Sequence, residues 1–283
     1  MVVFVIIIAI IAIIIVVKVS SKRNKEKLSG YYKSAAEHER NGNYDQAIND
    51  YNKALQLDSD PNYTRYKERG DLYRKTGNYD QAIADYNQAI SSAKNYIEKQ
   101  DNQYEKARKA AAELGKDGWG NFYYDRSKEN RSITEYKRNI AECLSLRGEM
   151  NDKNGNKTQA MADYDEAIKS FKNLGTDEDL ISCADVNIKK GNKEQALEIY
   201  NKLIWEFNKD FKEDTTDFLK LYSLCQICVK AGDYDKAIAN LETLLKFNQD
   251  NVQDYDDVKV LKDTQAKARE ELDAVKKMTA ASS

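Results

Sequence analysis

The stretch Gly42-Asn43-Tyr44-Asp45-Gln46-Ala47-Ile48 decides the fold of this chain. It returns almost unchanged as Gly77-Asn78-Tyr79-Asp80-Gln81-Ala82-Ile83, 35 residues further along. Three weaker copies follow, and they begin at Gly155, Gly191 and Gly232. Self-similarity at such a period is the signature of a protein built from stacked structural repeats.

Each copy has a physical interpretation as a junction between two helices. Glycine is the usual residue just past the end of a helix, because it adopts a left-handed conformation without strain. The Asn or Asp that follows tolerates a tight turn. An acidic residue such as Asp45 then suits the start of the next helix, where backbone N–H groups lack partners. We therefore expect a helix on each side of every copy.

The second helix of each unit carries a regular pattern of a small, a large and a small or apolar residue. The second member follows the first by four positions and the third by seven, which places all three on one face of a helix. A small first member lets two helices pack closely. The sets are Ala47, Tyr51 and Ala54; Ala82, Tyr86 and Ala89; Ala160, Tyr164 and Ala167; Ala196, Tyr200 and Leu203; and Ala237, Leu241 and Leu244.

These residues resemble the tetratricopeptide repeat family. On the first helix of a unit the family has a bulky residue, then Leu-Gly, then an aromatic residue. Tyr66, Gly70 and Tyr73 fit this pattern in the second unit, and Leu144 and Gly148 fit it in the third. The resemblance covers most of residues 28–250. It implies an all-α solenoid, a right-handed superhelix of helix-turn-helix units, and it leaves the function open.

The spacing of the copies sets the expected domain boundaries. Units one and two occupy residues 28–94, and units three to five occupy residues 140–250. The interval from Gly77 to Gly155 is more than twice the period, so an extra stretch lies between them. We interpret residues 95–139 as two neighbouring helices lengthened into a projecting hairpin, and a degenerate extra repeat is the alternative.

A further helix is expected after the last unit, over residues 254–278. Its apolar stripe includes Leu261, Ala266 and Leu272. Solenoids need a terminal cap with a polar outer face, and this helix is the natural candidate.

Composition agrees with a helical interaction protein. The 283 residues include 33% charged residues, a formal net charge of −2 and a single proline. Such balanced charge gives no reason to invoke nucleic acid as a partner. Four cysteines, at positions 143, 183, 225 and 228, are too few and too scattered for a disulfide framework.

The beginning of the chain is strongly apolar. Residues 2–17 contain no polar side chain, and we predict a transmembrane helix over residues 1–19. A signal peptide would need a positive start and an Ala-x-Ala-like cleavage site, which are missing, and a buried core helix is the other alternative. Residues 20–27 form a basic linker, which by the positive-inside rule places the repeats in the cytoplasm. An exported domain on the far side is the alternative location.

No residue pattern indicates catalysis. His38 is the single histidine and stands where the family has an aromatic residue, so packing is its expected role. Cys225-Gln-Ile-Cys228 lacks the second pair of ligands that a zinc site needs, and we expect it in the core. We find no P-loop, no dinucleotide-binding fingerprint and no HExxH motif. We therefore predict no catalytic residues, no metal site and no cofactor.

Two surfaces are candidates for binding. In a solenoid, the first helix of each unit lines a concave face, and its mixed charges suit an extended peptide or a helix. The expected lining residues are Tyr32, Lys33, Lys67, Glu68, Asp71, Glu149, Asp185, Tyr222 and Gln226.

The second candidate is the tip of the inserted hairpin, where glycines flank an aromatic cluster. Exposed aromatic clusters mark protein or membrane contacts, and the alternative is that they fold back onto the long helices. The cluster comprises Trp119, Phe122, Tyr123 and Tyr124.

Two functions follow from these expectations. The first is a membrane-tethered scaffold that recruits or assembles partner proteins through its repeats. The alternative is a structural or accessory subunit of a larger membrane protein complex, with the solenoid buried against neighbouring subunits. An enzyme has no positive support in the sequence.

Overall fold

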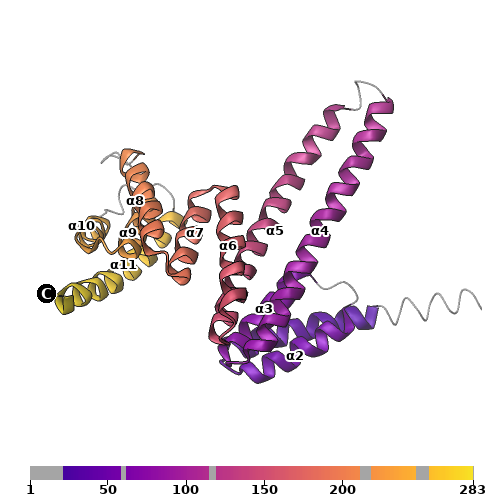
Figure 1. Cartoon of the computed structure of the whole chain (residues 1–283), viewed down its shortest axis with the longest axis horizontal. Coiled ribbons are helices and arrows are strands. Elements are labelled where there is room, and N and C mark those ends of the chain that lie inside the picture. Colours follow the sequence, from indigo (N-terminus) through magenta and orange to yellow (C-terminus); the bar gives the residue numbers. More distant parts are fainter. Residues whose placement is uncertain (1–21, 59–61, 115–118, 211–217, 247–254, 283) are drawn as a thin grey trace, which may run out of the picture. The chain divides into compact units, whose positions relative to one another are not determined.

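The computed structural model describes residues 22–58, 62–114, 119–210, 218–246 and 255–282. Within these ranges the secondary structure consists of helices and turns, with no β-strand. Side chains at 111–114, 119–130, 208–210, 220, 255–257 and 281–282 are not described. The chain divides into two compact units, Met1–Ser170 and Phe171–Ser283 (Figure 1).

Helices joined by short turns make up the first unit. Each helix packs on its neighbour in sequence: α2 on α3, α3 on α4 and α4 on α5. This local pairing is the helix-turn-helix arrangement that the repeated stretch predicts. The helices are residues 22–40, α2 (Tyr44–Leu57), α3 (Tyr63–Lys75), α4 (Tyr79–Leu114), α5 (Trp119–Lys153) and the first part of α6 (Lys157–Leu174).

The repeated glycines form the same turn in all five copies. Gly42 has φ of 75°, and the other four lie between 75° and 93°. At the first turn, the Gly42 N–H donates to the Glu39 carbonyl at 3.0 Å, and the Asn43 N–H donates to the His38 carbonyl at 2.9 Å. The same pair of bonds recurs at each of the other copies. These two bonds define the Schellman motif, whose positive φ explains why each copy begins with glycine.

The small–large–small pattern forms the contacts between helices. Every side chain of the five sets is buried, with an exposed fraction of 2% or less. The facing helix contributes a glycine in two units: a Cβ on Gly148 would lie 2.9 Å from the Tyr164 ring, and one on Gly70 would lie 3.0 Å from the Tyr86 ring. Both tyrosine rings therefore pack directly against a helix backbone.

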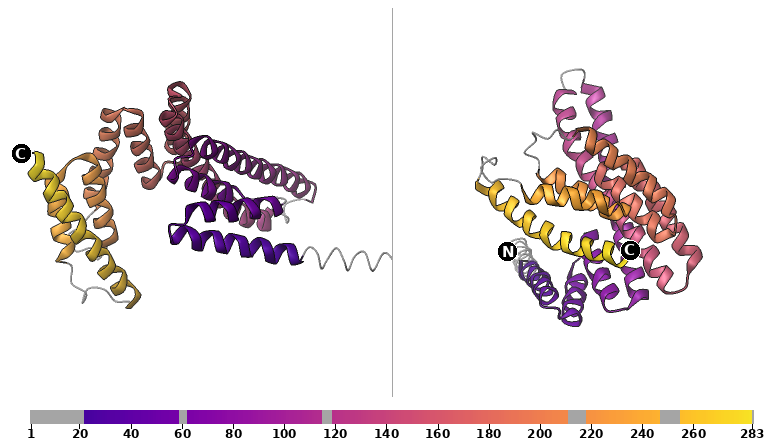
Figure 2. Two further views of the ribbon diagram at one scale, coloured as in Figure 1. Left: turned by 90° about the horizontal axis from the view of Figure 1, so that it is seen from below. Right: turned by 90° about the vertical axis from the view of Figure 1, so that its left-hand side faces the viewer.

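The extra residues between units two and three lengthen two helices. α4 has 36 residues and α5 has 35, whereas α2 has 14 and α3 has 13. Figures 1 and 2 show α4 and α5 side by side, extending beyond the shorter helices of the first unit. Residues 95–139 thus include the end of α4 and the beginning of α5, and residues 115–118 between them lie outside the described residues.

The second unit continues the alternation of short helices. Within it, α7 packs on α8, α8 on α9, α9 on α10, and α11 on both α9 and α10. A capping box, in which Thr176 and Asp179 exchange hydrogen bonds, begins α7. The helices are the end of α6, α7 (Asp177–Lys190), α8 (Lys193–Asp210), α9 (Phe218–Ala231), α10 (Tyr234–Leu245) and α11 (Tyr255–Ser282).

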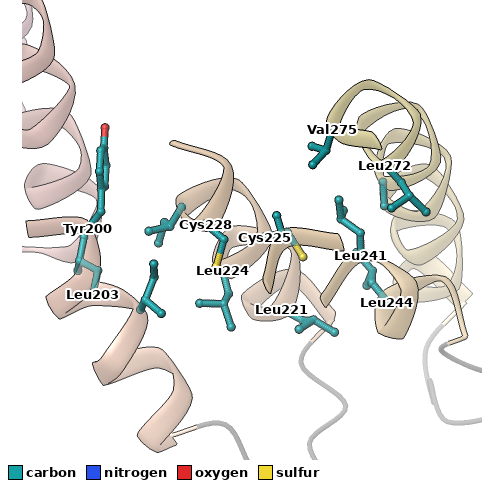
Figure 3. Close-up of a cluster of buried hydrophobic side chains, with 14 of the residues drawn as sticks. Tyr200, Leu203, Leu221, Leu224, Cys225, Cys228, Leu241, Leu244, Leu272 and Val275 are labelled. Atoms are coloured by element: carbon teal, nitrogen blue, oxygen red, sulfur yellow. The ribbon is translucent and has the colours of Figure 1, made fainter. Parts of the chain in front are cut away.

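The core of the second unit contains both cysteines of the Cys225-Gln-Ile-Cys228 stretch. Figure 3 shows them on α9, among leucines from neighbouring helices. Burial raises the pKa of the Cys225 thiol to about 12 and that of Cys228 to about 11. Both thiols are free, and at neutral pH both are protonated members of the core.

The terminal helix α11 buries a slightly different stripe from the predicted one. Leu261, Ala268 and Leu272 are buried, whereas Ala266 is exposed. The prediction for Ala266 is wrong because the buried face advances by three or four residues, through Thr264 and Ala268. The buried Thr264 hydroxyl is satisfied by donating to the Val260 carbonyl at 2.7 Å.

The predicted membrane location is contradicted by the described helices. None of the helices that the structure describes combines the length and apolar character needed to cross a membrane. The longest of them, α4 and α5, carry charged side chains along their length, and such side chains are costly inside a bilayer. The predicted anchor, residues 1–19, lies outside the described residues. The predicted single-pass membrane location, and with it the cytoplasmic placement of the repeats, is therefore wrong by this finding, and neither is retained.

Candidate functional site

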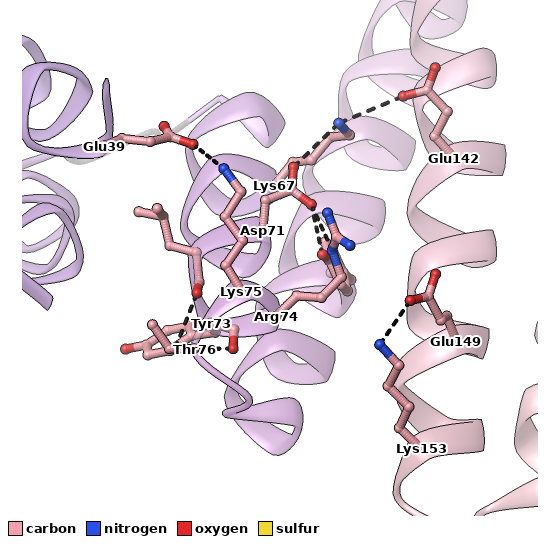
Figure 4. Close-up of polar contacts among 12 residues, drawn as sticks. Glu39, Lys67, Asp71, Tyr73, Arg74, Lys75, Thr76, Glu142, Glu149 and Lys153 are labelled. Carbon is pink, nitrogen blue, oxygen red and sulfur yellow. Dashed lines mark hydrogen bonds and ion pairs between the residues drawn. The ribbon is translucent and has the colours of Figure 1, made fainter. Parts of the chain in front are cut away.

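The charged residues predicted to line the first unit gather around Lys67. Its Nζ lies 3.6 Å from Asp71 Oδ2 on its own helix, α3, and 3.7 Å from Glu142 Oε2 on α5. Arg74 Nε lies 3.7 Å from Asp71 Oδ1, too far for a hydrogen bond, and has no hydrogen-bond partner among the described residues. Figure 4 shows these side chains between α3 and α5. The ion pairs therefore connect the first helices of two successive units.

Two further predicted residues belong to this part of the surface. Glu68 accepts hydrogen bonds from Arg65 Nη1 at 3.0 Å and from the Tyr51 hydroxyl at 3.2 Å. Glu149 lies on α5, where Lys153 Nζ approaches its carboxylate at 3.1 Å (Figure 4). Both side chains are partly buried, so their geometry is set before any partner arrives.

The helix over residues 22–40 supplies the remaining predicted residues of the first unit. The Tyr32 hydroxyl donates to Asp58 Oδ2 at 3.0 Å, and the Arg65 guanidinium lies over its ring, 4.3 Å from the ring centroid. Burial and the Asp58 carboxylate raise the pKa of the Tyr32 phenol. Lys33, next to it, is exposed.

The predicted residues of the second unit lie on α7 and α9. Asp185 accepts a hydrogen bond from the Tyr200 hydroxyl and pairs with Lys230 Nζ at 2.5 Å. Burial and the Glu271 carboxylate raise the pKa of the Tyr222 phenol, and Gln226 is exposed. Asp185, Tyr222 and Gln226 therefore belong to the second compact unit. Lys67 and its partners Asp71 and Glu142 belong to the first.

Sequence reasoning missed that several predicted carboxylates already have partners in the fold. The buried tyrosines of the small–large–small pattern direct their hydroxyls at them: Tyr86 donates to Asp71 Oδ1 at 2.8 Å, and Tyr200 donates to Asp185. The available signal was spacing, because both acids precede their tyrosine by fifteen residues. Asp71 and Asp185 therefore help to hold two helices of one unit together as well as facing outward.

Sequence reasoning also missed a ladder of partly buried arginines, each paired with a buried aspartate, in the first unit. Arg69 donates to both oxygens of Asp85, at 2.8 and 2.6 Å, and its third N–H group donates to Asn52 at 2.7 Å. Arg147 repeats this arrangement with Asp163 and, at 2.5 Å, with Asn87. Each arginine therefore connects its own helix-turn-helix repeat to the preceding repeat.

The predicted hairpin tip lies at the edge of what the structure describes. Trp119 begins α5, and Phe122, Tyr123 and Tyr124 lie in its first turns. Their side chains are outside the described residues. The tip therefore remains a prediction.

Residues 28–95 and 221–251 match tetratricopeptide repeat models. The resemblance seen in the sequence is confirmed for these residues. They include Lys67 and its partner Asp71 in the first unit, and Gln226 in the second. No curated protein matches the chain by sequence.

Solved structures with similar folds have low sequence identity. MamA is 15% identical, with 82% of this chain and 96% of that one covered, at a TM-score of 0.33. BtubC from P. vanneervenii is 16% identical, with 91% of each chain covered, at a TM-score of 0.35. A tetratricopeptide repeat protein from Parabacteroides merdae is 16% identical, with 88% and 93% covered, at a TM-score of 0.27. Likenesses this distant support no inference about function.

Proposed function

We propose that this chain is a protein-interaction scaffold, and that the Lys67 surface of its first unit binds an extended peptide or a helix of mixed charge. The observation that carries the proposal is the ion-pair network of α3 and α5, in which Lys67 lies between Asp71 and Glu142. Tetratricopeptide repeats in residues 28–95 support a role of this general kind.

The energetics of the network favour exchange with a partner. Ion pairs at this degree of exposure stabilise a fold by about 0–1 kcal/mol each, so little is lost when a ligand replaces one of them. The Arg74 guanidinium lies next to the network and adds a second positive charge, with which a carboxylate of the ligand can pair. Paired charges of both signs then select a ligand with the complementary order of charges.

The experiment compares two double variants with the same change in charge. Lys67→Gln/Arg74→Gln alters the proposed surface, and Lys94→Gln/Arg108→Gln alters exposed ion pairs elsewhere in the first unit. Partners are captured by crosslinking to the full chain, identified by mass spectrometry, purified and titrated calorimetrically against each form. We expect affinity to fall by about tenfold, or about 1.4 kcal/mol, for the first variant only. Equal affinities for both variants would rule out this surface.

A second candidate function is that of a subunit in a larger protein complex. It is favoured by two large apolar side chains in the second unit, Trp205 at 63% exposed and Leu219 at 50%. A contact with another subunit would remove this apolar surface from water. If the chain is such a subunit, Trp205→Ser/Leu219→Ser abolishes its copurification with the complex while Lys67→Gln/Arg74→Gln leaves it unchanged. The reverse result favours the scaffold.

A further inference from the structure

A polar cleft of about 390 Å³ lies where the long helices α4 and α5 meet the start of α3. This volume falls in the lower part of the range for small-ligand pockets. None of the residues predicted from the repeats to bind partners lines it. Asn95, Tyr96, Lys99 and Tyr136 come from residues 95–139, so the lengthened helices supply part of its wall.

One wall of the cleft is a stripe of polar side chains on α4. Gln88, Asn95 and Lys99 all line the cleft and are all exposed. They are separated by seven and four residues, so they lie on one face of the helix. The buried face of the same helix carries the alanines and Tyr86 of the repeat pattern.

The other walls include three tyrosine rings. Tyr66 comes from α3, and Tyr96 and Tyr136 come from α4 and α5. The last two rings stack with their centroids 4.0 Å apart and their planes 10° from parallel. Tyr136 also meets the buried Tyr63 edge-on, at 4.7 Å between centroids. The Tyr96 and Tyr136 rings are therefore held in place by packing, which reduces the entropy lost when a ligand binds.

The charge of the cleft is simple in a chain that is otherwise rich in charge. Charged residues make up 33% of the sequence, yet among the described residues that line the cleft Lys99 is the single charged one. Carboxamides, hydroxyls and phenol groups provide the rest of its polar surface. Such a site suits a ligand that is mostly neutral, hydrogen-bonds along its length and carries negative charge at one end.

We propose that this cleft binds an extended peptide segment that contains an acidic residue. Each carboxamide has an acceptor and two donors and can pair with the C=O and N–H groups of a peptide main chain. Gln88 and Asn95 are separated by about 10 Å along the helix axis, which equals about three residues of extended chain. The tyrosine rings then contact the peptide side chains, and Lys99 pairs with the acidic residue. This inference rests on the proposed function in that the ligand is a protein, but its site is a different one.

The test uses random 12-residue peptides displayed on phage and selected on the full chain. The cleft variant is Gln88→Ala/Asn95→Ala. Its matched control is Asn102→Ala/Gln103→Ala, which removes the same two residue types from exposed positions of the same helix. We expect selected peptides to be enriched in acidic residues, to bind the parent and the control equally, and to bind the cleft variant at least about tenfold more weakly. Lys99→Gln should weaken them and reduce the salt dependence of binding.

Other outcomes overturn the inference. Selected peptides that bind the parent and the cleft variant with equal affinity bind at another site. If Lys67→Gln/Arg74→Gln weakens their binding, the proposed scaffold function stands and the cleft proposal fails. No selected peptide at all also rejects the cleft. Two neutral oligosaccharides, chitohexaose and maltoheptaose, are titrated as a second probe. If they bind the parent but not the cleft variant, and no peptide binds the cleft, the ligand of the cleft is a sugar and the inference is wrong. Ser91→Tyr, which fills the cleft from an exposed position, replaces the double variant if that variant melts early.

Discussion

Replacing Arg147 with Met removes one partner of a buried ion pair that joins α5 to α6. Arg147 Nε donates to Asp163 Oδ2 at 3.0 Å, and Nη2 donates to Oδ1 at 2.5 Å. The Asp163 side chain is only 2% exposed. Asn151 and Gln159 donate to the same carboxylate, each at 3.0 Å. The variant therefore leaves a buried carboxylate with its two amide donors but without its cation.

The expected loss follows from this geometry. Breaking a buried pair from one side usually costs about 3–5 kcal/mol. Because Asn151 and Gln159 still hydrogen-bond the carboxylate, we expect the lower end, about 3 kcal/mol, for Arg147→Met. Arg147→Met/Asp163→Asn removes both charges and keeps an acceptor for the two amide donors. We expect this double variant to recover at least about half of the loss, since no uncompensated charge stays buried.

Urea unfolding measured by circular dichroism gives the total stability of each form. Repeat arrays can open locally, so hydrogen exchange of peptides from α5 and α6 locates the loss. Lys153→Met is the control, because it breaks an ion pair on α5 that is 44% exposed on the lysine side and should cost no more than about 1 kcal/mol. A loss below about 1 kcal/mol for Arg147→Met, or a double variant no more stable than the single one, would refute the reasoning.

Three further predictions concern packing, alkaline pH and thiol accessibility. Ala82→Leu overpacks a contact where Ala82 is fully buried and should cost about 1–3 kcal/mol in thermal unfolding; an unchanged Tm would contradict the register. Burial raises the pKa of Tyr164 to about 12, so above about pH 10 the unfolded chain loses a phenolic proton that the native chain keeps. The free energy of unfolding should then fall as pH rises, by up to about 1.4 kcal/mol per pH unit for this tyrosine. Urea unfolding at a series of pH values measures this dependence, and Tyr164→Phe should reduce the slope of the unfolding free energy against pH by that amount. An identical slope would argue against burial of the phenol. Burial also raises the thiol pKa values of Cys225 and Cys228, so a thiol reagent should label both only as fast as the second unit opens, and rapid labelling of the native chain would show that this core is accessible.

The turns and the helix contacts could be predicted because their causes are local. A glycine followed by Asn or Asp specifies the turn through the backbone of a few adjacent residues. The spacing of Ala82, Tyr86 and Ala89 specifies one face of a helix, and the structure buries all three. Even Gly70 and Gly148 could be identified, since the family pattern places a glycine where the tyrosine ring of the next helix packs.

The polar part of the structure could not be predicted in the same way. Arg69 and Arg147 look like ordinary surface charges in sequence, because the buried aspartates that pair with them lie sixteen residues away on another helix. Asp71, a predicted site residue, bonds the buried Tyr86, and only the fifteen-residue spacing between acid and tyrosine could have indicated this bond. The cleft beside Gln88 was missed for a related reason. Its lining residues come from α3, α4 and α5, and those on α5 are far in sequence from those on α4.

The arginine ladder explains how the chain accommodates its long insertion. Arg69 reaches Asn52 across a sequence separation of 17 residues, and Arg147 reaches Asn87 across 60, yet both make the same bond to the preceding unit. The third repeat therefore contacts the second repeat through the same arginine–asparagine bond that links the second repeat to the first. The inserted residues that the structure describes are helical, and α4 and α5 pack on each other, so the bond between the repeats is kept. The extension of α4 and α5 also supplies Asn95, Lys99 and the stacked tyrosines that line the cleft.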